Sequence, residues 1–337
     1  MLHSFDIRYN ITLILSCYHR LGDHMSVQRF TRKEMQKIIS EIMDRDVQVL
    51  PIGNHELRRH LVYRVIADDG EYVFKYYYQK NYGNREIASL KSLNESRIHV
   101  PKLVSYGMFG DSREWLLMNY MKGMPMVKVM HHVPRERQLE LFEEMGQELG
   151  AIHKYRKFDF FGEWDENGQP IHEHNTFLDA FMLGTERTFD IIKNRPLPNE
   201  DLLQKGVHLF HHHKELLLSV TEPHHAHLDY DARNIHIRKK EGQWHLSAIF
   251  DFEQSKPWDK DADFVHLYLK HFYDDPDLEK PFFEGYLKKS TLGPNFKDKF
   301  DLYMLYQCLS ICTWAFQPAP DYYEKALGVL NKLTEKM

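Results

Sequence analysis

The order of two hydrophobic patterns along the chain most constrains its fold. His60 to Ala67 and Tyr72 to Tyr78 are rich in β-forming residues, and Asp68-Asp69-Gly70 between them signals a hairpin turn. From Pro134 onward, apolar residues recur instead at helical spacing, as they do over 139–152. This order predicts an α+β protein, in which a small antiparallel sheet precedes a larger, mainly helical part.

Further elements follow from local signals. The sequence Thr31-Arg32-Lys33-Glu34 is a capping box that starts a helix. Asn84 is the expected N-cap of a helix over 84–97. We place a lobe boundary where the chain leaves the sheet, which gives an irregular extension over 1–24, a first lobe over 25–118 and a helical lobe over 119–337. Other strands are expected over 47–52, 101–106, 114–118, 235–238 and 244–250, and other helices over 177–192, 202–220 and from 264 to the end.

Composition excludes several classes of protein. The 337 residues include 44 Lys and Arg against 49 Asp and Glu, so the net charge of −5 argues against binding nucleic acid or anionic lipid. Only three cysteines occur, which argues against a disulfide scaffold and fits a reducing compartment. Cys308 and Cys312 are four residues apart, and we interpret them as two buried thiols of an apolar helix rather than a metal pair.

The amino terminus does not resemble a targeting signal. The apolar run from Ile11 to Leu15 is short for the core of a signal peptide, and Ser16-Cys17 only faintly resembles a lipoprotein site. No stretch approaches the roughly 18–20 continuous apolar residues that a membrane helix needs. We therefore expect a cytoplasmic protein.

The stretch His227-Leu228-Asp229-Tyr230-Asp231-Ala232-Arg233-Asn234 carries the strongest chemical signal. Two strands of similar length follow it, and such a hairpin returns the chain to its starting level. Asp251 is therefore expected beside Asn234, with Asp229 on the same loop. Two carboxylates and one amide then share a small volume. Such oxygen ligands suit Mg²⁺, which also binds phosphate oxygens.

A lysine in the first lobe offers the complementary charge. Lys75 lies inside an apolar strand, where an unpaired charge is costly. On the helix that follows, Glu86, Leu90 and Leu93 share one face. Glu86 is therefore the expected partner of Lys75, and the pair would hold the ammonium ready for an anionic ligand.

Together these residues resemble the aminoglycoside and choline kinase type of phosphotransferase, which shares the bilobal protein-kinase-like fold. The family's His-Gly-Asp…Asn loop corresponds to His227-Leu228-Asp229…Asn234, and its metal motif corresponds to Asp251-Phe252-Glu253. By resemblance, Asp229 is the catalytic base, and Asn234 and Asp251 are the magnesium ligands. Lys75, held by Glu86, then contacts the α- and β-phosphates of ATP, which makes residues 25–118 the nucleotide-binding lobe.

The same resemblance assigns the remaining nucleotide contacts. Residues 118–121, with Met118 and Tyr120, would form the hinge that receives the adenine, and the turn over the phosphates holds a single glycine, Gly53. Leu228 replaces the family's usual glycine, and Arg233 stands where the family tends to have a small residue. Asp259 and Asp263 match a later family pattern, and we expect one of them to anchor the catalytic loop.

The resemblance predicts an ATP- and Mg²⁺-dependent transfer of phosphate to a hydroxyl of a small molecule. Acidic residues near the loop favour a cationic acceptor, such as an aminoglycoside or an amino-bearing metabolite, although they also fit solvated surface charges. His172, His174 and Trp258 could equally serve a neutral sugar or macrolide. The acidic residues concerned are Asp231, Glu253, Glu163, Asp165, Glu166, Glu173 and Asp179.

Two other functions differ in class from this one. A kinase-like module could bind nucleotide and act on or through a protein partner, but the intact set of Lys75, Asp229, Asn234 and Asp251 argues against an inactive module. His225-Ala226-His227-Leu228-Asp229 also resembles the start of a zinc hydrolase motif, except that Tyr230 replaces its last histidine. The choice between ATP and GTP, and the oligomeric state, stay open.

Overall fold

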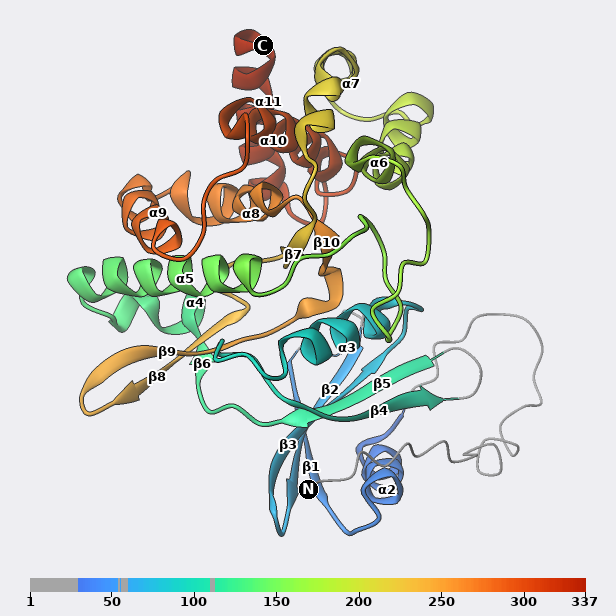
Figure 1. The fold of residues 1–337 in the computed structure, drawn as a ribbon, viewed down its shortest axis with the longest axis vertical. Coiled ribbons are helices and arrows are strands. Elements are labelled where there is room, and N and C mark those ends of the chain that lie inside the picture. The colour runs from blue at the N-terminus through green and yellow to red at the C-terminus, as the bar shows by residue number, and fades with distance from the viewer. Residues whose placement is uncertain (1–29, 54, 56–59, 110–112) are drawn as a thin grey trace, which may run out of the picture.

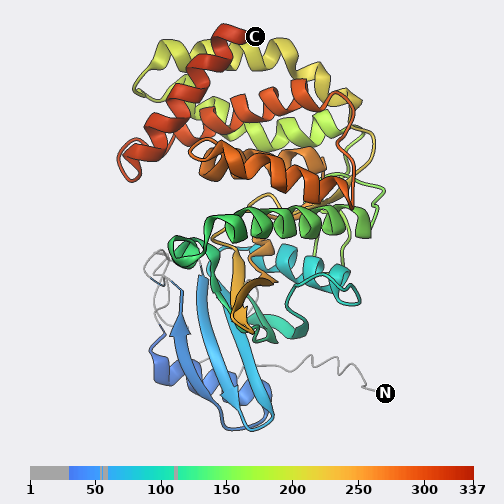
Figure 2. The same cartoon turned by 90° about the vertical axis from the view of Figure 1, so that its left-hand side faces the viewer.

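The two patterns fold into two lobes, as expected, in a computed structural model that describes residues 30–53, 55, 60–109 and 113–337. The sheet lobe lies at one end of the molecule and the helical lobe at the other, with helix α5 between them (Figures 1 and 2). The extension predicted over 1–24 lies outside the described residues. The division of the chain at residue 119 stays a prediction, and the last strand of the sheet ends at Asn119.

An antiparallel five-stranded sheet in the order β1-β2-β3-β5-β4 forms the first lobe. Strand β3 is central, and its residues alternate between two apolar layers. Phe74 and Tyr76 face helix α2, whereas Val73 and Tyr77 face helix α3 and the helical lobe. The elements of this lobe are α2 (Arg32–Met43), β1 (Gln48–Ile52), β2 (His60–Ala67), β3 (Gly70–Tyr77), α3 (Tyr82–Leu93), β4 (Leu103–Phe109) and β5 (Arg113–Asn119).

Long helices and a short hairpin form the second lobe. Strands β8 and β9 are joined by a tight turn at Glu241 and Gly242, both of which have positive φ. The main elements are α4 (Met126–Val129), α5 (Arg135–Tyr155), α6 (Phe177–Asn194), α7 (Glu200–His213), β7 (His224–Ala226), β8 (Ile235–Lys240), β9 (Gln243–Ile249), β10 (Lys256–Trp258), α8 (Phe264–Leu267), α9 (Glu279–Leu287), α10 (Phe296–Cys312) and α11 (Pro320–Lys336). Short β6 (Met124–Pro125) pairs with β8.

Several predicted element boundaries were wrong for identifiable reasons. The capping box at Thr31 and Glu34 is confirmed. Helix α3, however, begins at Tyr82 after Asn81, because the distant Glu114 carboxylate accepts the Asn81 backbone N–H at 2.7 Å. The long helices expected from Phe264 onward begin later, because α8 at Phe264 has only four residues and continues as a wider π-helical turn at residues 268–272, before Pro276 starts a separate turn.

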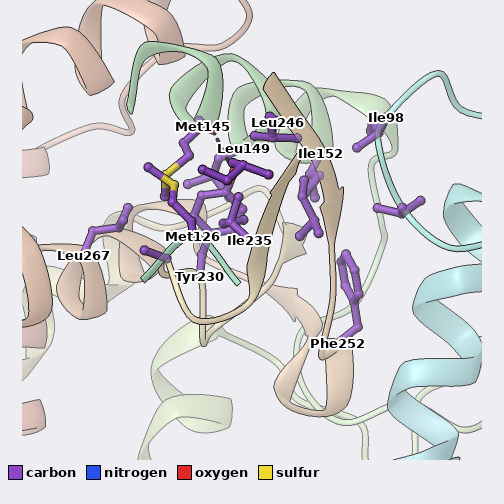
Figure 3. Close-up of a cluster of buried hydrophobic side chains, with 14 of the residues drawn as sticks. Ile98, Met126, Met145, Leu149, Ile152, Tyr230, Ile235, Leu246, Phe252 and Leu267 are labelled. Carbon is purple, nitrogen blue, oxygen red and sulfur yellow. Dashed lines mark hydrogen bonds between the residues drawn. The ribbon is translucent and has the colours of Figure 1, made fainter. Parts of the chain in front are cut away.

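One apolar core runs from the sheet into the helical lobe without a break. It joins the α3 side of the sheet to α5, the β8–β9 hairpin and α9, and it includes Tyr230 and Phe252 next to the predicted site residues (Figure 3). A second core holds α6, α7, α10 and α11 together. Cys308 and Cys312 are buried there and form no disulfide, which confirms their interpretation as buried thiols. Among the described residues, no helix has both the length and the apolar character needed to cross a bilayer.

Helices α5 and α9 approach each other closely because glycine faces backbone on both sides. A Cβ atom added to Gly146 would lie 2.0 Å from the Phe282 carbonyl oxygen, and one added to Gly285 would lie 2.0 Å from the Glu143 carbonyl oxygen. Neither contact can be relieved by a side-chain rotation, since backbone atoms are involved on each helix.

We therefore expect Gly146→Ala and Gly285→Ala each to lower the free energy of unfolding by about 2 kcal/mol or more, because the helices must separate. Gly184→Ala is the control, since Gly184 lies within α6 and its added Cβ meets no atom within 4 Å. That control should be neutral or stabilising by up to about 1 kcal/mol. Denaturant unfolding measures all three. Equal effects of Gly146→Ala and Gly184→Ala would contradict the packing argument.

Candidate functional site

Lys75 is a buried point at which the two lobes meet through charge. Its Nζ lies 2.7 Å from Glu86 Oε2 on α3, 2.7 Å from Asp251 Oδ1, and 3.4 Å from Glu253 Oε2. The pairing of Lys75 with Glu86 is confirmed, and both side chains are at least 95% buried. Burial opposes the charge, but the carboxylates outweigh it and raise the pKa of Lys75 well above its usual value, so the ammonium stays protonated.

Tyr77 and the conformation of Asp251 complete this cluster. The Tyr77 hydroxyl donates to the same Glu86 oxygen as Lys75, which fixes the carboxylate from a second side. Asp251 follows β9 in the left-handed region at φ 67°, which aspartate tolerates better than most residues. Its side chain is 27% exposed, unlike those of Glu86 and Glu253. Asp251 is therefore the carboxylate of this cluster that a ligand can reach.

The Lys75 cluster carries excess negative charge. Three carboxylates surround one ammonium, and a nearby divalent cation would balance the difference. Among the described residues, Glu86, Asp251 and Glu253 form the one group of three or more His, Cys, Asp or Glu side chains with ligand atoms within 4.8 Å of one another. The proposed zinc motif at His225, His227 and Asp229 is not such a group.

The β8–β9 hairpin brings Asn234 beside the segment that ends in Asp251, as predicted. Ile235 pairs with Ile249, and the Phe250 N–H donates to the Asn234 carbonyl oxygen at 2.9 Å. The side chains, however, have different partners. The Asn234 amide donates to the Asp229 carbonyl oxygen at 2.8 Å and to Asp229 Oδ2 at 3.1 Å, whereas Asp251 bonds Lys75. Their roles as metal ligands stay predictions.

Asp229 lies at the exposed side of the catalytic loop among cationic groups. Its Oδ1 is 3.2 Å from both Lys270 Nζ and Arg233 Nη2, and 3.7 Å from His266 Nδ1. Burial raises the pKa of Asp229, but Lys270, His266 when its ring is protonated, and Arg233 outweigh burial and lower it. Asp229 is therefore ionised at neutral pH and can only accept hydrogen bonds.

Asp263 anchors the backbone of this loop. Its Oδ2 accepts the His227 N–H at 2.8 Å and faces His153 Nε2 at 2.8 Å, and its Oδ1 accepts the Leu228 N–H. The expectation that one of the later aspartates ties down the loop is thus confirmed for Asp263. Asp259 instead bonds Lys299 at 2.6 Å in the helical core.

Tyr230 and His227 tie the loop to the elements around it. The Tyr230 hydroxyl donates to the Met145 carbonyl oxygen of α5 at 2.8 Å, and His227 Nε2 lies 3.0 Å from the Phe250 carbonyl oxygen. Both side chains are fully buried. These contacts indicate that His227 holds the loop in place.

The predicted adenine and phosphate contacts lie around the sheet. Met118 is buried in the core on the α3 side of the sheet, and Tyr120 follows β5 with the Arg64 guanidinium stacked on its ring at 4.4 Å. Gly53 follows β1 with φ 77°, and within the described part of the chain no atom lies within 4 Å of an added Cβ. Its backbone conformation rather than crowding requires glycine there. The nucleotide-binding roles of these three residues stay predictions.

The acidic residues expected to form a wall for a cationic acceptor are largely neutralised. Asp231 is fully buried, with Arg233 and Lys270 each 2.6 Å away, and Glu163 pairs with Arg85 and Lys256. Glu253 belongs to the Lys75 cluster, and Asp179 caps α6. Trp258, suggested for a neutral acceptor, is buried against Phe177 and Phe181. Asp231, Glu163 and Glu253 are therefore paired with cations of the chain itself, and their role toward an acceptor stays a prediction.

Sequence reasoning missed Lys270, His266 and His153. A signal for two of them was present, because positions 263, 266 and 270 are separated by three and four residues and therefore share one helix face. Asp263 on that face contacts the catalytic loop, so Lys270 and His266 were predictable neighbours of Asp229. His153 lies on α5, more than one hundred residues from Asp263, and no local spacing reveals it.

Comparisons with known proteins agree with this geometry. A sequence profile described as the phosphotransferase enzyme family, APH, matches residues 54–296. No curated protein sequence matches the chain. Among solved structures, aminoglycoside phosphotransferase APH(4)-Ia is similar, with a TM-score of 0.67 at 14% identity over 90% of this chain and 99% of the other.

Two other solved structures share the fold. The GDP complex of aminoglycoside 2'-phosphotransferase-IIIa has a TM-score of 0.63 at 14% identity, covering 91% of this chain and 99% of the other. A putative aminoglycoside phosphotransferase from Ralstonia eutropha has a TM-score of 0.62 at 14% identity, covering 91% and 98%. These likenesses confirm the predicted bilobal fold.

Leu228, which stands at the family's usual glycine, adopts φ 61° in the left-handed region. For a residue with a Cβ this conformation costs about 1–2 kcal/mol. We expect Leu228→Gly to be more stable than Leu228→Ala by about 1 kcal/mol, because both lose the side chain but only glycine relieves the backbone. Denaturant unfolding of the two variants measures this difference directly. A more stable alanine variant would show that the backbone here is not strained.

Proposed function

The chain belongs to the phosphotransferase enzyme family, and from that membership we propose that it transfers the γ-phosphate of ATP, with Mg²⁺, to a hydroxyl group of a small molecule. The ion pair between Lys75 and Asp251 carries this proposal, because it joins the sheet lobe to the segment after β9 at one buried point. A kinase needs a cation for the phosphates and a carboxylate for the metal within one site.

The donor set supports a magnesium ion. Asp251 offers a partly exposed carboxylate, and Asn234, whose amide nitrogen donates to Asp229, offers its carbonyl oxygen. Oxygen ligands of this kind are those that Mg²⁺ prefers. When bound there, Mg²⁺ would supply charge neutralisation on the phosphate oxygens. The excess of carboxylates around Lys75 supports the same assignment.

The chain's own residues would carry out the remaining steps. Lys75, held by Glu86 and Tyr77, would orient the α- and β-phosphates with a permanent positive charge. Asp229 would orient the acceptor hydroxyl and take its proton late, as the oxygen–phosphorus bond forms and the β–γ bridge breaks. Lys270 and Arg233 keep Asp229 ionised and in position.

The acceptor class is a proposal of its own. A thermostable mutant of APH(4)-Ia forms a ternary complex with ADP and hygromycin B, so aminoglycosides are the first acceptors to test. Because Arg233 and Lys270 neutralise Asp231 and Asp229, recognition of a polycation would depend on other side chains. Neutral hydroxyl compounds should therefore be tested as acceptors together with the aminoglycosides. We keep the cytoplasm as the expected location.

Labelled ATP or GTP incubated with a panel of aminoglycosides, macrolides and hydroxylated metabolites tests the function. We expect transfer to a small molecule, and Asp229→Ala should reduce it by about 100-fold or more, since a positioned general base contributes that much. Nucleotide affinity should be retained in this variant. Asp298→Ala, on the exposed first turn of α10, is the control. Transfer to protein alone would favour the partner-directed module, and full activity of Asp229→Ala would remove Asp229 from the mechanism.

Asp251→Ala tests the metal assignment separately. In the wild-type protein, calorimetry should show tighter binding of a non-hydrolysable ATP analogue with MgCl₂ than with EDTA. The variant should lose that difference, because the exposed carboxylate of the Lys75 cluster is absent. An unchanged magnesium-dependent affinity would count against Asp251 as a ligand, whatever the activity of the protein.

A further inference from the structure

Glu163 lies between the two elements that supply the carboxylates around Lys75. Its Oε2 is 2.8 Å from Arg85 Nη1 on α3, and its Oε1 is 3.1 Å from Lys256 Nζ at the start of β10. Arg85 immediately precedes Glu86 on α3. Lys256 comes three residues after Glu253, on the segment that begins at Asp251. One carboxylate therefore connects both sides of the Lys75 cluster from outside it.

The loop that carries Glu163 is itself fixed to the same elements. The fully buried Trp164 donates from Nε1 to the Ser255 carbonyl oxygen at 3.0 Å, and the Gly162 N–H donates to the Pro257 carbonyl oxygen at 3.0 Å. Farther along α3, Lys91 Nζ donates to the Glu166 carbonyl oxygen at 2.8 Å. In Figure 1 the green chain after α5 reaches down to α3. We call residues 162–166 the bridging loop.

The charges of this contact favour a fixed geometry. Burial raises the pKa of Glu163, but Lys256 and Arg85 outweigh burial and lower it, so the carboxylate stays ionised. The Arg85 and Lys256 side chains are only 9% and 17% exposed, and each lies over an aromatic ring, that of Tyr82 or Trp258. Removing Glu163 would leave two poorly solvated cations facing each other.

We propose, resting on the proposed function, that Glu163 is a positioning residue that sets the distance between α3 and the 251–257 segment. It thereby fixes the geometry in which Lys75 meets the nucleotide phosphates. Glu163 pairs with Arg85 and Lys256 and not with Lys75, so it acts on Lys75 only through α3 and the 251–257 segment. Its effect is therefore expected on ligands that carry phosphates and not on the nucleoside alone, which separates positioning from a general loss of structure.

The test measures affinity of the full-length protein for Mg·AMP-PNP and for adenosine by calorimetry and competition. Glu163→Gln should weaken Mg·AMP-PNP about fivefold or more, as the loss of a partly buried charged contact does, and leave adenosine within about twofold. Arg85→Gln should show the same selective loss, and the double variant should be no weaker than either single variant. Glu143→Gln is the matched control, because Glu143 is also 32% exposed and pairs with Lys288.

Every outcome of this experiment either supports or overturns the positioning role of Glu163. Equal losses for Mg·AMP-PNP and adenosine, or Glu163→Gln and Arg85→Gln variants that both keep wild-type affinity, would overturn the positioning role. So would additive losses in the double variant. If Glu163→Gln does not fold, the Arg85→Gln result decides on the same two ligands. A wild-type protein that binds neither ligand would refute the proposed function, and this inference with it. If the wild-type protein binds both ligands and only the results for the variants differ from expectation, the positioning role is refuted and the proposed function stands.

Discussion

A single buried ammonium organises this molecule. Burying the charged ammonium of Lys75 without partners would be costly, so the charged form requires carboxylates beside it. They come from α3 and from the segment after β9, which belong to different lobes. The charge requirement of one strand residue therefore draws the helical lobe against the sheet, at the place where a phosphate chain would be bound.

Charge pairing also holds the loop that carries Asp229, where cations surround carboxylates instead of carboxylates surrounding a cation. Asp229 and Asp231 are two neighbouring anions, and Lys270 and Arg233 bring an equal number of positive charges to them. Burial, with Lys270 nearby, lowers the pKa of His266 to about 4, so that ring is neutral and adds no further charge. The loop is consequently balanced within the chain itself, whereas the Lys75 cluster is not. That imbalance supports the proposal that magnesium binds at the Lys75 cluster rather than at the loop.

How much of this could be read from the sequence depends on the range of the interaction. The alternation of β3 and the helical spacing of Glu86 with Leu90 and Leu93 are local, and together they predicted the Lys75–Glu86 pair correctly. The hairpin symmetry likewise predicted the approach of Asn234 to the end of β9. The predicted start of α3 was wrong because Glu114, on strand β5, caps this helix. The cation partners of Glu163 and Asp231 were not predicted for a similar reason, since Arg85, Lys256 and Lys270 reach them only in the folded chain.

The hydroxyl of Tyr230 connects the contact between α5 and α9 to the loop that carries Asp229. It bonds the carbonyl of Met145, whose neighbour Gly146 is pressed against the α9 backbone, while Tyr230 itself is adjacent to Asp229. The spacing of α5 and α9 thus helps to set the position of Asp229, the proposed base. Substitutions that push α5 and α9 apart at this contact would therefore alter turnover, even though the substituted residues lie where no substrate contacts them.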